Sequence, residues 1–269
     1  MDAAGDLHRE TLLLLRTNSA KIDRLPLSHL DNLVVVLVRP RNPLNIGAAA
    51  RAMTNFGCRH LRLVNPYKLA FREARSAVGA AHVLQDAEEF KTVAEAVGDC
   101  SLVVGTTAVR DRSLRQTVRK LDDLAAGLVR AALKDGRAAL LFGSEKIGLT
   151  NADFSHCHWL MTIPTHADNI SMNLGQAVAV CLYEMARATS AVPVEEKVEL
   201  ATAGKAEQIT ELLFEALRIS GYVKPGTDKM FEEKTRQLIL RFKLEDYDAK
   251  LLLGMVRQMV WKLKLPTKT

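Results

Sequence analysis

A serine and an asparagine, spaced as Ser171-x-Asn173, stand directly before a helical pattern that runs to Arg187. The apolar residues of that pattern recur at the i, i+3, i+4, i+7 spacing of a helix with one buried face: Leu174, Ala177, Val178, Cys181, Leu182 and Met185. The first turn of a helix has backbone N–H groups without partners and the positive end of the helix dipole, so it suits a phosphate or carboxylate ligand. Taken alone, Ser171 and Asn173 are more simply explained as a helix cap and a first-turn polar residue.

Two polar motifs upstream make a functional role for Ser171 and Asn173 the better explanation. Asn45 opens an alanine-rich helical stretch at 46–56, and Arg51 follows it by six residues. Glu145 lies in a second loop, FGSEKIGLT at 142–150, which follows an apolar run. Each alone has a simpler explanation: Asn45 as a cap, Arg51 as a surface charge, and Glu145 as a structural ion-pair partner. The sequence has neither G-x-G-x-x-G after its first strand nor G-x-x-x-x-G-K-[ST], so it supports no nicotinamide-binding fold and no P-loop.

Apolar runs and helical patterns alternate through the first two thirds of the chain, which predicts an α/β fold with a mostly parallel sheet. The run at 33–38, LVVVLV, has the continuous apolar character of a parallel strand buried on both faces. Ligands bind such sheets beyond the carboxyl ends of the strands, so we expect the loops at 105–109, at 142–150 and from residue 163 onward to meet in one pocket. We predict strands at 33–38, 60–64, 102–105, 138–142 and 159–163, and helices at 46–56, 88–97, 121–133 and from 174 onward.

The chain is long enough for a large domain and a small one. It has 269 residues, of which 48% are hydrophobic. Three apolar helical patterns follow a stretch without such a pattern near the C-terminus. Helices of that number and size fold only marginally alone, so this tail should dock on the core, on a second subunit or on RNA. We predict an N-terminal extension at 1–30, a core domain at 31–190, a linker at 191–203 and a small helical domain at 204–269.

The charge of the chain suits a polyanionic partner such as RNA. The net charge is +6, and residues 204–269 hold 13 basic and 9 acidic side chains, which is +4 of that total. Between residues 39 and 75 there are eight Lys or Arg side chains and one acid, so we expect a basic surface beside the first motif. Ordinary solvated surface explains these charges about equally well. If the tail binds RNA, its expected phosphate contacts are Lys234, Arg236, Arg241 and Lys243.

We expect a cytoplasmic protein with no membrane span and no metal. The apolar run at 12–15 is far too short to cross a bilayer and lacks the layout of a signal peptide. The four cysteines are scattered without a C-x-x-C pair, which indicates reduced thiols rather than disulfides or a structural zinc site. His156, Cys157 and His158 point to alternate faces of an extended chain, so they do not converge on one ion.

Three ordered motifs resemble those of a known family: N-I-G-A-A-A-R at 45–51, F-G-S-E-K-I-G-L at 142–149 and I-P-x7-S-M-N-L at 163–174. They are similar to the motifs of the SPOUT-class RNA ribose methyltransferases of the TrmH family, and the resemblance covers roughly residues 31 to 190. It implies S-adenosylmethionine as the cofactor, a trefoil-knotted core, and a homodimer formed around the first and last core helices. True knots are so rare that spacing alone would predict an open sheet.

Within this family the chain most resembles the TrmJ branch, which methylates the ribose 2′-hydroxyl of the first anticodon-loop nucleotide of tRNA. The finer match rests on VVGTTAVR at 103–110, on RAMTNFG at 51–57 and on the helical tail. The resemblance thus implies a tRNA 2′-O-ribose methyltransferase for a cytidine or uridine. The alternatives are a methyltransferase for ribosomal RNA or another tRNA site, and a non-catalytic RNA-binding protein of the same fold. The presence of Arg51 and the Ser-x-Asn pair favours an enzyme.

The resemblance assigns the cofactor site largely to backbone groups of the three loops. A side chain at Gly143 would keep the backbone away from the adenosine. Met172 replaces the leucine that is usual in the family, a change that conserves volume. The implied cofactor-binding residues of this chain are Thr106, Thr107, Ala108, Gly143, Ile163, Ile170, Ser171 and Met172.

Arg51 matches the catalytic arginine of the family. Because a guanidinium has a pKa above about 12, it is poorly suited to accept a proton, and we expect it to clamp an RNA phosphate whose oxygen takes the ribose proton. Asn45, Ser171 and Asn173 would complete the hydrogen bonding around the ribose. Glu145 would hold Arg51 or a loop amide. Two alternatives stay open for Arg51, which can serve the cofactor of its own subunit or that of the partner subunit.

Overall fold

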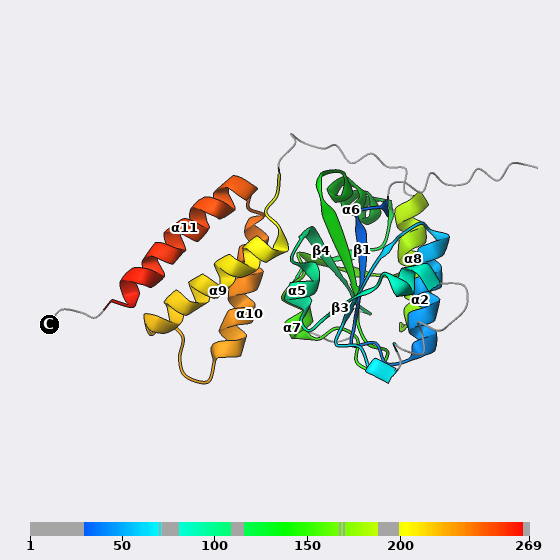
Figure 1. Cartoon of the computed structure of the whole chain (residues 1–269), viewed down its shortest axis with the longest axis horizontal. Helices are drawn as coiled ribbons and strands as arrows, with labels where there is room; N and C mark the ends of the chain where they lie inside the picture. Colours follow the sequence, from blue (N-terminus) through cyan, green and yellow to red (C-terminus); the bar gives the residue numbers. More distant parts are fainter. Residues whose placement is uncertain are drawn as a thin grey trace, which may run out of the picture.

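The computed structural model describes residues 30–69, 71, 81–108, 116–166, 168, 170–187 and 199–265 (Figure 1). The strands in this part of the chain are β1 (Leu33–Val38), β2 (His60–Val64), β3 (Glu88–Phe90), β4 (Cys100–Thr106), β5 (Val118–Lys120), β6 (Arg137–Phe142) and β7 (Trp159–Thr162). The core helices are α2 (Pro43–Asn55), α4 (Ala81–Gln85), α5 (Val93–Val97), α6 (Asp123–Asp135), α7 (Asn151–Phe154) and α8 (Leu174–Arg187). The tail helices are α9 (Ala203–Ile219), α10 (Asp228–Phe242) and α11 (Asp246–Leu263).

The seven strands form one sheet in the order β3-β2-β1-β6-β4-β7-β5, and every neighbouring pair is parallel. The predicted α/β fold with a mostly parallel sheet is therefore confirmed. Because β1, β6, β4 and β7 are neighbours, their carboxyl ends lie side by side at one edge. The loops that leave these four ends carry the polar motifs of the sequence.

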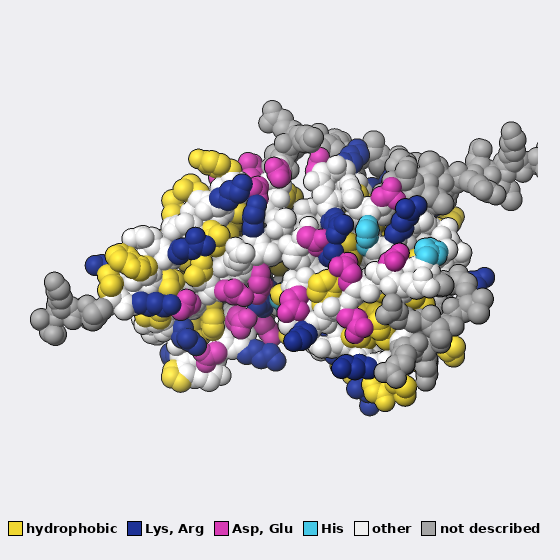
Figure 2. Space-filling view, viewed as in Figure 1, with side chains coloured by type: hydrophobic (Ala, Val, Ile, Leu, Met, Phe, Trp, Pro, Cys, Tyr) yellow, Lys and Arg dark blue, Asp and Glu magenta, His cyan; other side chains and the backbone are white. Residues whose placement is uncertain are grey.

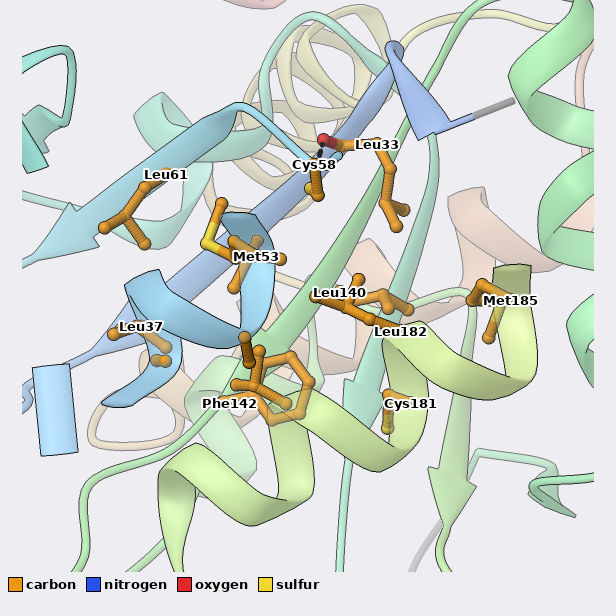
Figure 3. Close-up of a cluster of buried hydrophobic side chains, with 14 of the residues drawn as sticks. Leu33, Leu37, Met53, Cys58, Leu61, Leu140, Phe142, Cys181, Leu182 and Met185 are labelled. Carbon is orange, nitrogen blue, oxygen red and sulfur yellow. Dashed lines mark hydrogen bonds between the residues drawn. The ribbon is translucent and has the colours of Figure 1, made fainter. Parts of the chain in front are cut away.

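Both faces of the sheet are buried beneath helices. Side chains of β1 alternate between two hydrophobic clusters: Val35 belongs to the cluster with α2 and α8, and Val36 to the cluster with α5 and α7. Figure 3 shows the first cluster, in which Met53 of α2, Phe142 of β6 and Leu182 of α8 lie close together. A strand without a solvent face needs no polar positions, which explains the uninterrupted apolar run of β1.

Helices α2 and α8 pack against each other on one face of the sheet (Figure 1). Asn42 caps α2, since its side-chain oxygen accepts a hydrogen bond from the N–H of Leu44 at 2.9 Å, and Pro43 takes the first helical position. A Cβ on Gly175 of α8 would lie 2.5 Å from the Cβ of Ala48. The small residues at this crossing therefore allow the two helices to approach closely.

The tail docks on the core beside α5 and α7 through α9 and α10, and α11 packs on the outer side of α9 (Figure 1). The N–H of Gly204 donates to the carbonyl of Gly98 at 2.9 Å, and a Cβ on Gly204 would lie 2.6 Å from that oxygen. Deeper in the interface, Arg236 of α10 donates to the hydroxyl of Ser155 at 3.1 Å. The predicted helical tail is present, and of the three docking partners considered it contacts the core.

Residues 88–97 do not form the single helix that their pattern predicts. The first three form β3, which pairs with β2 by placing Glu88 opposite Arg62. Helix α5 begins only after Thr92, whose hydroxyl accepts from the N–H of Glu95 while the Glu95 carboxylate accepts from the N–H of Thr92. This capping box starts the helix there. Periodicity also misses β5, α4 and α7, which have three to five residues each.

No helix in the described part of the chain is long and apolar enough to span a bilayer. Residues 1–29 and 188–198 lie outside the described residues, and so do residues 109 and 110 of the VVGTTAVR stretch. The first range holds nearly all of the predicted N-terminal extension, and the second holds much of the predicted linker. The trefoil knot and the domain boundaries stay predictions.

Candidate active site

A cavity of about 530 Å³ opens at the sheet edge where β4, β6 and β7 end. Ligand pockets in proteins typically measure about 300 to 1,000 Å³, so this cavity has the size of a cofactor site. Its wall combines the three loops that the sequence predicted to meet. All eight residues predicted to bind the cofactor line it, namely Thr106, Thr107, Ala108, Gly143, Ile163, Ile170, Ser171 and Met172.

The loop after β6 turns back on itself to form one wall of the cavity. The N–H of Gly148 donates to the carbonyl of Ser144 at 2.8 Å, and Gly148 has a φ of 68°, a left-handed conformation that favours glycine. A Cβ on Gly143 would lie 2.0 Å from the carbonyl carbon of Gly148 and 2.2 Å from the nitrogen of Leu149. Gly143 is therefore needed for the loop to close on itself, and not only for a ligand to approach.

Side-chain hydrogen bonds join the three motifs beside this cavity. The Nδ2 of Asn45 donates to Oε1 of Glu145 at 3.0 Å, and the Nδ2 of Asn173 donates to Oδ1 of Asn45 at 2.8 Å. The Oδ1 of Asn173 accepts from the N–H of Gly175 at 2.9 Å and so caps α8. Glu145, Asn45 and Asn173 thus orient one another, although the sequence places them about one hundred residues or more from their partners.

Glu145 also fixes the loop after β1. Its carboxylate accepts hydrogen bonds from the N–H groups of Arg41 at 3.2 Å and Asn42 at 3.1 Å. Burial raises the pKa of Glu145, but the hydrogen bonds from its own backbone and from Asn45, Asn42 and Arg41 outweigh that effect and hold its pKa below the usual value. Of the two roles expected for Glu145, the structure places it on loop amides rather than on Arg51.

Arg51 lies on the exposed side of α2 and does not line the cavity. Among the described residues, none forms a hydrogen bond or ion pair with its guanidinium. Arg51 lies six positions further along the helix than Asn45, a rise of about 9 Å. The guanidinium is therefore available to a phosphate or to a second subunit.

Three residues of this site were missed in the sequence. Arg39 directly follows β1 and has a φ of 53°. It forms a two-pronged ion pair with buried Asp153, in which Nη1 and Oδ1 are 3.0 Å apart. Burial raises the pKa of Asp153, but the hydrogen bonds from Arg39 and Thr150 outweigh it and lower the pKa overall. Phe154, the next residue, lines the cavity. The spacing Thr150-x-x-Asp153, which forms a capping box, is the signal that would have revealed α7.

Several arginines counted as basic surface are engaged inside the molecule. Arg62 is 4% exposed and pairs with Asp99 at 2.5 Å. Arg236 is 7% exposed and pairs with Glu207, so the prediction that it contacts RNA phosphate is wrong. Figure 2 shows Lys and Arg side chains mixed with acidic ones on the visible face. Exposed basic side chains close in sequence to the first motif are Arg41, Arg51 and Arg59.

The histidines of the H-C-H segment have separate surroundings. His156 faces Glu207 at 3.8 Å, whereas Nδ1 of His158 accepts from the N–H of Val103 at 3.1 Å. Burial lowers the pKa of both histidines to about 4, helped at His156 by nearby Arg236. In the described segments, no group of three His, Cys, Asp or Glu side chains is arranged to hold a metal ion, and the cysteines are free and buried.

Comparison of the sequence with known proteins shows to which family the chain is similar. The SpoU rRNA Methylase family matches residues 32–183. A protein named tRNA (cytidine/uridine-2'-O-)-methyltransferase TrmJ from Yersinia pestis (strain Pestoides F) is 32% identical over 247 residues, which cover 89% of this chain and 95% of that protein. An uncharacterized tRNA/rRNA methyltransferase of Haemophilus influenzae is 33% identical over 238 residues, or 84% of this chain and 94% of that protein.

A solved structure extends the similarity to the fold. The crystal structure of TrmJ from Z. mobilis ZM4 superposes with a TM-score of 0.73 at 32% identity, covering 84% of this chain and 98% of that one. The family match spans more than half of the chain, and the relatives span most of it. The chain therefore belongs to the SpoU methylase family, as the resemblance of its three motifs predicted.

Proposed function

We propose that this protein is an S-adenosylmethionine-dependent tRNA 2′-O-ribose methyltransferase that acts on a cytidine or uridine at the first position of the anticodon loop. The observation that carries the proposal is the cavity at the ends of β4, β6 and β7, with Asn45 and Asn173 hydrogen-bonded beside it. The tRNA substrate is supported by the TrmJ relative from Yersinia pestis, which matches 89% of the chain and so extends beyond the core. We also propose that the enzyme acts in the cytoplasm.

The lining of the cavity fits the proposed cofactor. Leu149, Phe154 and Ile163 supply apolar surface for an adenosine, and the ends of β4 and β6 supply backbone donors and acceptors around it. When bound, S-adenosylmethionine supplies a methyl group on a sulfonium, and the departure of that methyl neutralises the positive charge without an acid from the protein. The residues of this chain then have to hold the cofactor, orient the ribose and manage one proton.

Arg51 orients the ribose, and the hydrogen-bonded side chains beside the cavity keep its polar rim in place. The guanidinium of Arg51 binds an RNA phosphate in a two-pronged fashion and so orients the adjoining ribose. A phosphate oxygen accepts the proton of the 2′-hydroxyl, because the guanidinium holds its own protons too strongly. Asn45, Asn173 and Glu145 keep the polar rim of the cavity in a fixed orientation, with Ser171 on its wall. Fixed orientation is the main source of rate in such a transfer.

A homodimer formed on α2 and α8 would complete the site. Leu44 of α2 is 79% exposed and Tyr183 of α8 is 50% exposed, so this pair of helices has apolar side chains left for a partner. Arg51 lies on the same helix as Leu44 and outside the cavity of its own subunit. Pairing of two subunits through these helices would bring one subunit's Arg51 toward the other's cavity.

Methylation of ribosomal RNA is the second candidate, favoured by the name of the family and by the relative from Haemophilus influenzae. Mapping of 2′-O-methyl groups in tRNA and ribosomal RNA, from cells with and without the gene, separates the two substrates. We expect the loss to be confined to the first anticodon-loop nucleotide of some tRNAs. A loss in ribosomal RNA alone would refute the tRNA proposal. Calorimetry of S-adenosylmethionine binding, with a chelator present, tests the cofactor site independently.

A further inference from the structure

Three consecutive residues at the end of α7 contact three different parts of the molecule. Asp153 binds Arg39 in the loop after β1, Phe154 lines the cofactor cavity, and Ser155 accepts a hydrogen bond from Nη1 of Arg236 in the tail at 3.1 Å. Ser155 has no exposed surface, so water does not compete for this hydrogen bond. This segment is thus a physical connection between the tail and the cavity.

Arg236 is held firmly on the tail side of this connection. Its Nε and Nη2 donate to the two carboxylate oxygens of Glu207, each at 2.7 Å, and Nη2 also donates to Glu232 at 2.7 Å. A buried guanidinium with a two-pronged carboxylate partner has little freedom to move. The position of α9 and α10 therefore determines where the donor for Ser155 lies.

The constraint continues from Ser155 into the cavity wall. The N–H of Ser155 donates to the carbonyl of Asn151 at 3.0 Å, and the N–H of Phe154 donates to the carbonyl of Thr150 at 2.9 Å. Thr150 directly follows Leu149, which lines the cavity and packs in the same buried cluster as Phe154. A shift of α7 cannot occur without moving two of the apolar residues on that wall.

We propose that the tail sets the shape of the cofactor cavity through Arg236, Ser155 and α7, which makes Arg236 a positioning residue for methyl transfer. Arg236 acts through Ser155 and touches neither the cofactor nor the RNA. This inference rests on the proposed function in so far as the cavity holds S-adenosylmethionine. Thermodynamic linkage then requires that a tRNA which shifts the tail alters the affinity for the cofactor, and that the cofactor alters the affinity for that tRNA by the same factor.

Ser155→Ala in the full-length protein tests the connection. It removes the acceptor for Arg236 and leaves Arg236 paired with Glu207, and it also removes the hydrogen bond that the same hydroxyl donates to the carbonyl of Ala152 at 2.6 Å. We expect the Kd for S-adenosylmethionine to rise by about three- to tenfold, as for members of one hydrogen-bond network. Hydrogen exchange of residues 143–154 should become faster without any ligand. Ser220→Ala is the matched control, since that hydroxyl donates only to the carbonyl of Leu217 at the exposed end of α9, and it should change neither measurement.

Arg236→Lys keeps the charge but loses the planar fork, so it should reproduce the effect of Ser155→Ala, and the double variant should show little further loss. A role of Arg236 in tail stability alone would lower the unfolding temperature and leave both the Kd of the folded protein and the exchange of 143–154 unchanged, which would overturn the proposal. If the unmodified protein does not bind S-adenosylmethionine, the proposed function fails. The exchange of residues 143–154 still decides the connection in that case, because that measurement needs no cofactor.

Discussion

Replacing Gly143 with alanine tests the wall of the cavity most directly. The added Cβ would lie 2.0 Å from the carbonyl carbon of Gly148, 2.2 Å from the nitrogen of Leu149 and 2.5 Å from the oxygen of Gly148. Non-bonded carbon atoms normally stay about 3.5 to 4.0 Å apart, so the opposing backbone has to retreat by about 1.5 Å. All three contacts are backbone atoms, and no side-chain rotation relieves them.

The displacement falls on a segment that lines the cofactor cavity from residue 143 to residue 149. Overpacking of this kind costs about 1 to 3 kcal/mol, and displacement of a reactant by about 1 Å can reduce a rate about a hundredfold. We expect the Kd for S-adenosylmethionine to rise at least tenfold, or about 1.4 kcal/mol, when measured by calorimetry. The protein should remain folded, because the loop and not the buried sheet absorbs the shift.

Gly47→Ala provides the matched control. Gly47 lies within α2, and a Cβ there would meet no atom within 4 Å. Alanine in a helix is favoured over glycine by about 0.8 to 1 kcal/mol, so this variant should be slightly more stable and bind the cofactor normally. Cofactor binding by Gly143→Ala that equals that of Gly47→Ala would refute the proposed role of the loop.

Three further predictions concern charge. Arg51→Ala should abolish methyl transfer while S-adenosylmethionine binding persists, and Arg51→Lys should restore little because the fork is lost; near-normal turnover of the alanine variant would contradict the phosphate clamp. Because the pKa of buried His158 is lowered to about 4, the stability that it contributes is present above its unfolded pKa and is lost as the pH falls. From a value of about 6.5 in the unfolded chain, this loss should reach about 2 kcal/mol at pH 5 in urea titrations and diminish in His158→Gln. Lys234→Ala and Arg241→Ala should each reduce the slope of the log–log salt dependence of tRNA binding by about 0.7 to 0.9, and unchanged slopes would show that neither residue contacts a phosphate.

Much of the core follows from patterns that are local in the sequence. The apolar run of β1 predicts a strand buried on both faces. The alternation of strands with helices predicts a parallel sheet, in which the carboxyl ends of the strands share one edge. That geometry brings the loops after Thr106, Phe142 and Thr162 together, so the eight residues implied by the resemblance line one cavity. Their functional roles stay predictions, because proximity alone does not test them.

Other features depend on contacts that no local pattern contains. The sequence Glu88–Phe90 has helical character, but pairing with β2 adds backbone hydrogen bonds that only the folded sheet offers. Arg236 has the composition of a surface residue, and only the docking of α10 places it between Glu207 and Ser155. The ion pair of Arg39 with Asp153 joins residues 114 positions apart. Charge counts from sequence overestimate the free basic surface wherever such internal pairs form.

The position of Arg51 outside its own cavity leads to a last prediction, which concerns the subunit that it serves. Arg51→Ala leaves the cavity intact, whereas Gly143→Ala leaves the arginine intact. At a concentration of S-adenosylmethionine well below the Kd of Gly143→Ala, each variant alone should show little activity. If Arg51 acts on the cavity of the partner subunit, a mixed dimer regains one complete site, and random 1:1 exchange restores about a quarter of the sites of the unmodified protein.

If Arg51 instead acts within its own subunit, no mixed dimer contains a complete site, and mixing restores nothing. The control is a mixture of two Arg51→Ala preparations, one of them tagged, which should exchange subunits equally well without regaining activity. Subunit exchange is followed by recovery of the untagged chain with the tagged one, and methyl transfer to tRNA is measured in the same samples. In a mixed dimer, the intact cavity belongs to the Arg51→Ala subunit and the intact Arg51 belongs to the Gly143→Ala subunit. If the subunits exchange and no activity is gained, this arginine does not act on the partner's cavity, and action across the dimer is excluded.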